Sequence, residues 1–226
     1  MKKKTRWPIY LIIGLIITFI AFTVPLPYYI EVPGTSEDIR KVLQVNNQSD
    51  QEEGSYQFVT VGVKHARLVD LVYAWLTPFT DIHSAKEMTG GSSDAEFMRI
   101  NQFYMETSQN MAKYQGLKSA GKEIELKYLG VYVLTVTDNS TFKGILNIAD
   151  TVTAVNDKTF ESSKEMVDYV NSQTLGDKVK VTYQEDGKVK TAEGKIITLE
   201  NGKNGIGIGL IDRTEVSSDV PIKFST

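Results

Sequence analysis

The stretch Tyr128-Leu129-Gly130-Val131-Tyr132-Val133-Leu134-Thr135-Val136-Thr137 is rich in aromatic and β-branched residues and predicts a strand. A polar loop beginning at residues 138–140 leads to a second apolar run, Thr151 to Val155. That run ends in Asn156-Asp157, a pair typical of tight turns. We therefore expect two strands that lie in one sheet and are joined by a loop.

A short helix is predicted directly after these strands. Ser162 and Glu165 have the spacing of a capping box, in which each residue satisfies a backbone N–H of the first helical turn. The helix is expected from about Ser163 to Ser172, and it places Met166 and Val170 on one face. We expect this apolar face to cover the sheet.

A hairpin follows the helix. Val179 to Tyr183 and Lys188 to Thr191 flank Asp186-Gly187, a pair that readily adopts the positive φ angles of a two-residue hairpin turn. A further strand is expected over residues 195–199. From residue 123 onward the chain is therefore predicted to hold short strands and one short helix, within a chain of the α+β class.

A longer helix is predicted upstream, from Asp94 to about Gln115, where Ser93 and Glu96 form another capping box and Gly116 ends the helix. Its apolar residues fall on one face and are expected to contact a core: Phe97, Ile100, Tyr104 and Met111. Alternating apolar residues over Tyr56 to Val63 predict a strand. Together these elements predict a mixed α/β region over residues 28–122.

The N-terminal segment predicts a membrane anchor. Lysines at positions 2–4 and Arg6 precede Ile9 to Val24, which is almost wholly apolar, and Trp7 to Leu26 has about the 20 residues of a spanning helix. A cleaved signal peptide is less consistent with this longer apolar run. The pattern predicts a single-pass protein in the cell membrane, with residues 1–27 as cytoplasmic stub and anchor, residues 7–26 in contact with lipid, and the C-terminal part extracellular.

Composition excludes several classes of function. Beyond the four basic residues of the stub, the chain carries 21 basic and 28 acidic residues, a balance that disfavours nucleic acid as a partner. The absence of cysteine removes disulfides and thiol chemistry, and suggests a Gram-positive origin for an extracellular domain. His65 and His83 lack the spacing of metal ligands. No metal or cofactor is expected, and Gly205-Ile206-Gly207-Ile208-Gly209 alternates like a strand instead of opening a helix as a phosphate loop does.

The order of elements over residues 128–199 resembles a bacterial PDZ domain. The resemblance implies a small β-barrel with one capping helix over residues 123–200. The resemblance makes Tyr128-Leu129-Gly130-Val131 the loop whose backbone N–H groups capture the carboxylate of a peptide. The following strand would pair with the peptide, and the helix would form the opposite wall. The chain has Ala149-Asp150 and Asn156-Asp157 where such domains usually have Gly-Asp and Asn-Gly. The implied peptide-binding residues are Tyr128, Leu129, Gly130, Val131, Tyr132, Val133, Met166 and Val170.

The flanking segments extend the resemblance over essentially the whole chain. Residues 27–34, residues 58–61 and residues 71–76, in this order before the PDZ-like segment, resemble the membrane-anchored, PDZ-containing Lon-like serine peptidases of the SepM type. Those streptococcal enzymes process a competence pheromone outside the cell, in quorum sensing. Residues 201–226 resemble the opening strands of the peptidase domain, which is here incomplete.

The resemblance implies a catalytic Ser/Lys dyad, but the Pro-Ser-Ala-Gly segment of the nucleophilic serine is not among these 226 residues. No residue is assigned a catalytic role, and the chain is expected to be inactive by itself. Three hypotheses follow: the anchor and PDZ portion of a peptidase that processes a secreted peptide, a non-catalytic PDZ module that regulates another protease, or a region up to Lys122 that serves as a platform or homo-oligomer interface.

Overall fold

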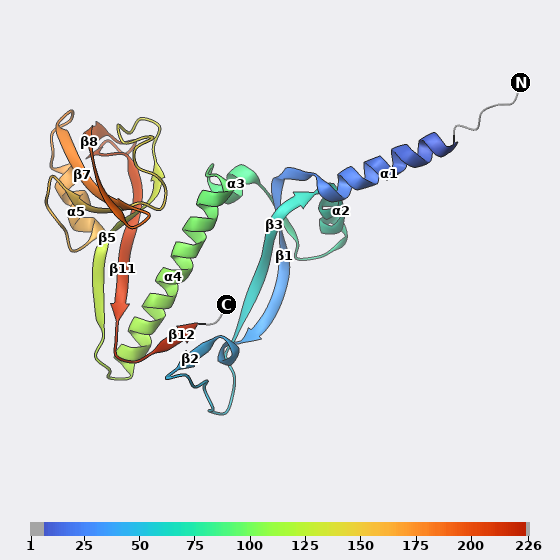
Figure 1. Ribbon diagram of the computed structural model, residues 1–226, viewed down its shortest axis with the longest axis horizontal. Helices are drawn as coiled ribbons and strands as arrows, with labels where there is room; N and C mark the ends of the chain where they lie inside the picture. The colour runs from blue at the N-terminus through green and yellow to red at the C-terminus, as the bar shows by residue number, and fades with distance from the viewer. Residues whose placement is uncertain (1–6, 225–226) are drawn as a thin grey trace, which may run out of the picture. The chain divides into compact units, whose positions relative to one another are not determined.

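The computed structural model describes residues 7–224, which form two compact units (Figure 1). The first, here called the ribbon unit, comprises residues 7–93 and 222–224. The second, here called the sheet unit, comprises residues 94–221. Strand β12 (Ile222–Phe224) belongs to the ribbon unit because it pairs antiparallel with β2 (Leu43–Val45).

The sheet unit contains a five-stranded antiparallel sheet and two helices. Its sheet has the strand order β11-β5-β6-β7-β8, and a separate pair is formed by β9 and β10. The elements are α4 (Asp94–Ser119), β5 (Glu125–Val136), β6 (Thr151–Val155), α5 (Ser163–Asn171), β7 (Lys178–Glu185), β8 (Lys188–Lys195), β9 (Ile197–Thr198), β10 (Asn204–Gly205) and β11 (Ile208–Ser217). Strands β10 and β11 thus belong to the same unit as residues 123–200.

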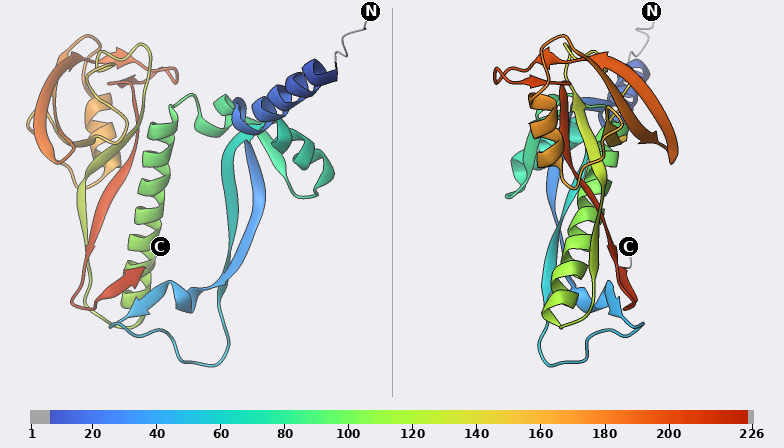
Figure 2. Two further views of the ribbon diagram at one scale, coloured as in Figure 1. Left: turned by 45° about the vertical axis from the view of Figure 1, so that its right-hand side comes forward. Right: turned by 90° about the vertical axis from the view of Figure 1, so that its left-hand side faces the viewer.

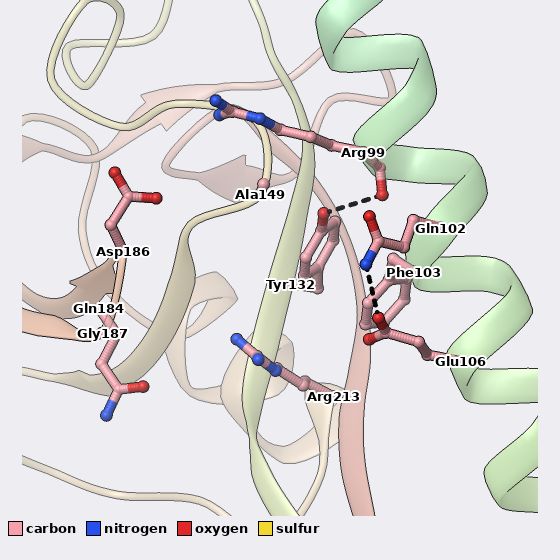
Figure 3. Close-up of a pocket in the computed structure, with 10 residues that line it drawn as sticks. All are labelled: Arg99, Gln102, Phe103, Glu106, Tyr132, Ala149, Gln184, Asp186, Gly187 and Arg213. Carbon is pink, nitrogen blue, oxygen red and sulfur yellow. Dashed lines mark hydrogen bonds between the residues drawn. The ribbon is translucent and has the colours of Figure 1, made fainter.

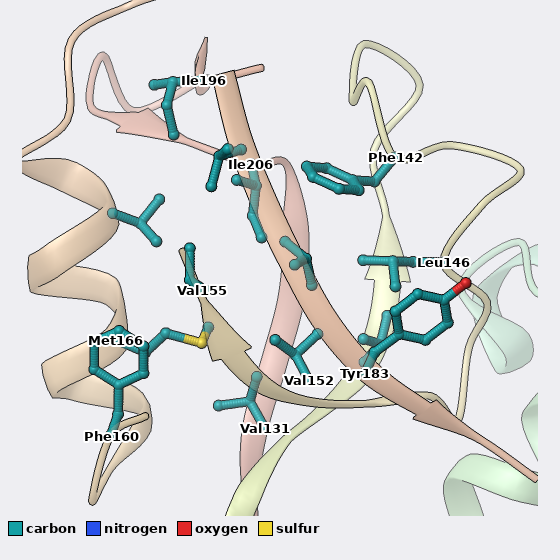
Figure 4. Close-up of a cluster of buried hydrophobic side chains, with 14 residues drawn as sticks. Val131, Phe142, Leu146, Val152, Val155, Phe160, Met166, Tyr183, Ile196 and Ile206 are labelled. Carbon is teal, nitrogen blue, oxygen red and sulfur yellow. The ribbon is translucent and has the colours of Figure 1, made fainter. Parts of the chain in front are cut away.

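One hydrophobic core lies between this sheet and α5 (Figure 4). Alternating residues of the strands point into it, which is the consequence of the two-residue period of a strand. Met166 and Val170 enter from α5 and are almost fully buried. The core consists of Val131, Val133, Phe142, Leu146, Val152, Val155, Phe160, Met166, Val170, Val179, Val181, Tyr183, Ile196 and Ile206.

The local predictions for the sheet unit are confirmed where turn and cap chemistry determines the backbone. Ser162 accepts a hydrogen bond from the Glu165 N–H at 3.2 Å, and α5 begins at the predicted residue. Asp186 and Gly187 have φ angles of 47° and 77°, so that β7 and β8 form the predicted hairpin. The α and β composition of the fold is confirmed as well.

The long helix differs from its prediction. Helix α4 runs to Ser119 and includes Gly116, where we expected it to end. Its buried residues are Phe103 and Leu117, whereas Tyr104 and Met111 of the predicted apolar face are exposed. The reason is that α4 turns a different face to the sheet. Phe103 stacks on Tyr132 of β5, and the Asn110 side-chain amide donates to the Thr214 carbonyl of β11 at 3.4 Å.

The ribbon unit is built around two long antiparallel strands, which Figure 2 shows as a twisted pair. Its elements are α1 (Trp7–Thr23), β1 (Pro25–Asp38), the short 3₁₀ helix η1 (Ile39–Lys41), β2, β3 (Gln57–Arg67), α2 (Leu68–Leu76), β4 (Asp81–Ser84), α3 (Ala85–Thr89) and β12. The strand order is β3-β1-β4. The strand predicted over residues 56–63 is confirmed from residue 57 onward, because β3 begins at Gln57.

The predicted membrane-spanning helix is wrong. Helix α1 has 17 residues and ends at Thr23, because Pro25 lacks a backbone N–H and begins the extended strand β1. Between residues 7 and 224, no helix has the length and apolar character needed to cross a membrane.

This finding also overturns the predicted single-pass cell-membrane location, which depended on that helix. The basic stub, with lysines at positions 2–4 and Arg6, lies outside the described residues.

Candidate functional site

A narrow apolar hollow separates α5 from the segment that enters β11. Its volume is about 50 Å³. The side chains of Met166 and Val170 form one wall, and the backbone from Gly205 to Leu210 forms the other. The lining is completed by Val167, Asn171 and Leu199.

Two glycines allow the backbone to form this wall. Gly207 has a φ of +74°, and a Cβ there would approach the Thr137 Oγ1 to 2.6 Å. A Cβ on Gly205 would come equally close to the side chain of Leu199. At Gly207 a side chain would be both crowded and strained by the positive φ, whereas at Gly205 it would have to displace the side chain of Leu199.

The carbonyl groups of the same segment are held by the loop after β5. The Ile206 carbonyl accepts a hydrogen bond from the Ser140 hydroxyl at 2.6 Å, and the Gly207 carbonyl accepts one from the Thr137 N–H at 2.9 Å. A trans peptide unit is planar and points its N–H opposite to its carbonyl. The N–H groups of Gly207 and Ile208 consequently point away from that loop.

Strand β11 forms one edge of the five-stranded sheet. It pairs with β5 from Ile208 to Ser217, and it has no strand on its other side within residues 7–224. Strand β5, by contrast, lies between β11 and β6, and pairs with β6 at Val131 and Tyr132. The sheet therefore has two edge strands, β11 and β8, and β11 is the one that lies beside α5.

The far end of the same edge meets the N-terminus of α5. The Asp212 carboxylate accepts a hydrogen bond from the Ser163 N–H at 2.7 Å. Tyr128 lies nearby, and burial, together with the charges of Asp212 and Glu165, raises the pKa of its hydroxyl to about 12. The tyrosine is therefore neutral at every physiological pH.

The residues predicted from the sequence lie in two places. Met166 and Val170 line the hollow, whereas residues 128–133 are in β5. Val131 and Val133 are fully buried, and Tyr132 stacks on Phe103 of α4 with ring centroids 3.8 Å apart. Gly130 has a φ of +133°, and a Cβ there would lie 2.3 Å from the Val152 carbonyl oxygen. A glycine is thus needed at position 130, where the backbone of β5 comes close to the backbone of β6.

The residues that sequence reasoning missed are those of the Gly205 to Leu210 wall. The signal was present: Ile206-Gly207-Ile208 has an apolar residue on each side of a glycine and stands directly before a strand. The same pattern occurs at residues 129–131, which the resemblance to PDZ domains makes the binding loop. Both positions fit the pattern, and only the pairing of the strands separates them.

A second and larger cavity, of about 330 Å³, lies between α4 and the sheet on the opposite side of β5 (Figure 3). The stacked rings of Phe103 and Tyr132 form part of its wall, and the Tyr132 hydroxyl donates to the Arg99 carbonyl at 3.3 Å. The Arg213 guanidinium donates to the Thr151 hydroxyl at 2.6 Å. Both arginines and the acidic residues Glu106 and Asp186 line this cavity, which is therefore polar and mixed in charge.

The comparisons with known proteins concern the sheet unit. The PDZ domain family matches residues 101–196. The PDZ domain of an SdrC-like protein from Listeria monocytogenes is 35% identical, with 38% of this chain and 93% of that chain covered and a TM-score of 0.37. The corresponding domain from Listeria innocua is 38% identical, with 36% and 92% covered and a TM-score of 0.35.

A further solution structure, from Geobacillus thermodenitrificans, is 30% identical, with 35% of this chain and 94% of that chain covered and a TM-score of 0.32. The comparison with curated proteins gave no match.

Proposed function

This chain contains a PDZ domain, and we propose that its sheet unit binds the C-terminal end of a peptide in the hollow between α5 and residues 205–210. PDZ domains typically take up a peptide as an added strand at the edge of their sheet. In this chain, the open edge and the apolar hollow lie beside the same strand, β11. That coincidence is the observation that carries the proposal.

The wall of the hollow supports recognition of a carboxylate. The N–H groups of Gly207 and Ile208 point away from the loop that binds their neighbouring carbonyls. Successive N–H groups that point to one side form an anion-binding concavity, which would receive the terminal carboxylate of the peptide. The apolar side chains of Met166 and Val170 would contact its last side chain.

The narrowness of the hollow supports a small ligand side chain. A volume of about 50 Å³ is suited to a methyl-bearing side chain, such as that of alanine or valine, and not to an aromatic ring. We therefore expect selection for small apolar residues at the C-terminus of the peptide.

Isothermal titration with a library of hexapeptides tests the proposal. Peptides with a free carboxylate and a small apolar last residue should bind, and amidation should weaken binding about tenfold or more because it removes the charge that the N–H groups receive. Equal affinity for the free and amidated peptides would overturn carboxylate capture.

A matched pair of variants locates the site. Val167 lines the hollow and is partly exposed, so Val167→Arg should fold and obstruct the peptide. Val189 on β8 is exposed and does not line the hollow, and Val189→Arg is its control. We expect only the first variant to lose affinity. Loss in both, or in neither, would place the site elsewhere.

The resemblance to the Lon-like serine peptidases supports a finer proposal, in which the bound peptide is a substrate, of the competence-pheromone class, for a serine endopeptidase. The 226 residues hold no Pro-Ser-Ala-Gly segment, so this chain is expected to bind such a peptide and not to cleave it. Mass spectrometry of the peptide after incubation with the purified chain checks this. Cleavage would require a nucleophile other than the serine that the resemblance implies.

A further inference from the structure

Asp212 lies at a particular position along the open edge of β11. Because side chains of a strand alternate between its two faces, Ile208, Leu210 and Asp212 share one face. Ile208 and Leu210 line the hollow beside α5. Asp212 is the next residue of that series, and its carboxylate reaches the first backbone N–H of α5, that of Ser163, at 2.7 Å.

Two further hydrogen bonds are made around the N-terminus of α5. Ser162 accepts a hydrogen bond from the Glu165 N–H at 3.2 Å, and the Glu165 carboxylate accepts one from the Glu161 N–H at 3.0 Å. The contact with Asp212 is therefore an additional link between the helix and the sheet edge, made by a charge-assisted hydrogen bond. It joins the two walls of the groove directly.

An added strand cannot pass through this link. A strand that pairs with β11 would lie about 4.8 Å from it, and its side chains need further room before the helix. At Asp212 that space is occupied by the carboxylate and by the Ser163 N–H that it contacts. The part of the edge that lies beside the hollow and before this link, Ile208 to Ile211, is about 14 Å long at about 3.4 Å per residue.

We propose that Asp212 closes the far end of the groove and limits the paired part of the ligand to about the last four residues of a peptide. This inference rests on the proposed function, because it assumes a peptide beside β11 with its carboxylate near Gly207. Residues further from the C-terminus leave the groove at Asp212 and extend into solvent. Asp212 acts as a positioning residue, because it limits the ligand without contacting the terminal carboxylate.

A truncation series tests the limit. One hexapeptide that binds is taken from the library, extended to eight residues and shortened to four and three, with every peptide N-acetylated so that no amine charge moves. The affinity of the full chain should rise from three to four residues. It should then stay within about twofold up to eight residues, since no further main-chain hydrogen bonds form.

Variants of Asp212 identify the cause. In Asp212→Ala the link is lost, and the eight-residue peptide should bind about fivefold more tightly than the four-residue peptide, the effect of roughly one added hydrogen bond. Asp212→Asn keeps an oxygen acceptor for the Ser163 N–H and should restore the limit. Asp168→Ala removes an exposed acidic side chain from α5 itself, and we expect it to keep the limit.

The outcomes separate the two proposals. Wild-type affinity that keeps rising beyond four residues would overturn the limit and leave peptide binding intact. A limit that persists in Asp212→Ala would overturn the role of this residue. If peptides of all lengths fail to bind the wild type, the proposed function fails and the inference fails with it. Should Asp212→Ala not fold, Asp212→Ser takes its place in the series, because the shorter side chain cannot reach the Ser163 N–H and should likewise lose the limit.

Discussion

The two units of the chain use similar strands and bury them very differently. Strand β7 of the sheet unit alternates between buried and partly exposed residues, and its Val179 and Val181 lie in the core. Strand β3 of the ribbon unit also carries alternating apolar residues, yet Val59 is 80% exposed and Val61 59%. All residues of the core cluster come from the sheet unit. Alternation alone therefore predicts a strand but does not show which face is covered.

The largest expected effect of this difference is on core packing. Phe142 is fully buried, and Phe142→Ala should lower the free energy of unfolding of the sheet unit by about 3–5 kcal/mol, because the lost contacts leave a cavity. Val61→Ala in the ribbon unit should change stability by less than about 0.5 kcal/mol. Hydrogen exchange of the β7 and β3 amides measures each unit separately. Similar effects of the two substitutions would contradict the contrast.

The second effect concerns close backbone contacts. In Gly130→Ala the new Cβ meets the Val152 carbonyl oxygen at a positive φ, and we expect a loss of about 2–4 kcal/mol from strain and overpacking together. Gly62→Ala in the ribbon unit meets only the end of the Val32 side chain, at 2.9 Å, which can move. Its expected cost is below about 1 kcal/mol. Thermal unfolding followed by circular dichroism compares the two variants.

The Gly130 variant also tests the interpretation made from the sequence. If Gly130→Ala stays as stable as the wild type but loses peptide binding, the binding loop lies at residues 128–131 after all. If it is destabilised, and binding by the folded fraction is unchanged, Gly130 has a structural role in the sheet.

Local signals in the sequence were sufficient for much of the sheet unit. The cap at Ser162, the hairpin at Asp186-Gly187 and the apolar face with Met166 and Val170 each depend on neighbouring residues alone. Local signals were not sufficient to locate the candidate site, because the choice between Gly130 and Gly207 as the glycine of the binding loop depends on strand order. Residues 204–217 return to pair with β5 and become the edge, and that long-range pairing leaves no local signal.

Reasoning from local composition also caused the wrong prediction of a membrane-spanning helix at the N-terminus. The apolar run from Ile9 to Val24 was read by composition, which does not give the residue at which a helix ends. Pro25 falls inside the predicted span from Trp7 to Leu26 and Pro27 directly after it, and the structure places both in β1. The prolines ended the helix earlier than hydropathy indicated.

A smaller effect is expected from Asp70, a buried acid of the ribbon unit. Its carboxylate accepts hydrogen bonds from the Lys64 ammonium at 2.7 Å and the Arg67 N–H at 2.9 Å. Burial favours the neutral acid, but these contacts outweigh it and lower the pKa of Asp70. Its contribution to stability is therefore present above the unfolded pKa and is lost as the pH falls through the folded one. Asp70→Asn should destabilise the ribbon unit by about 1 kcal/mol at pH 7.

The measurement for Asp70 is the pH dependence of β3 hydrogen exchange. The difference between wild type and Asp70→Asn should shrink below about pH 4, where the wild-type carboxylate also takes up a proton. A difference that is the same at every pH would mean that lost hydrogen-bond geometry, and not charge, causes the effect.

The smallest effect is expected from Asp150 in the sheet unit. Its replacement by asparagine should raise the stability, whereas the replacement of Asp70 should lower it. Asp150 is 3% exposed, close to the 7% of Asp70, and its carboxylate accepts a hydrogen bond from the Asn147 N–H at 2.8 Å. No cation within residues 7–224 forms an ion pair with it, and burial, reinforced by the charge of Glu185, raises its pKa. A raised folded pKa means that its contribution to stability is present at low pH and is lost as the pH rises through that value.

Asp150→Asn keeps an oxygen acceptor and removes the buried charge. It should therefore stabilise the sheet unit at pH 7, by less than about 1 kcal/mol, and the gain should disappear at low pH, where the wild type is neutral too. Urea unfolding at pH 7 and pH 4 measures both values. Destabilisation at pH 7 would show that the Asn147 contact needs the full negative charge. The two acids are buried to a similar extent, so the opposite signs would follow from the presence of Lys64 beside one carboxylate and of Glu185 near the other.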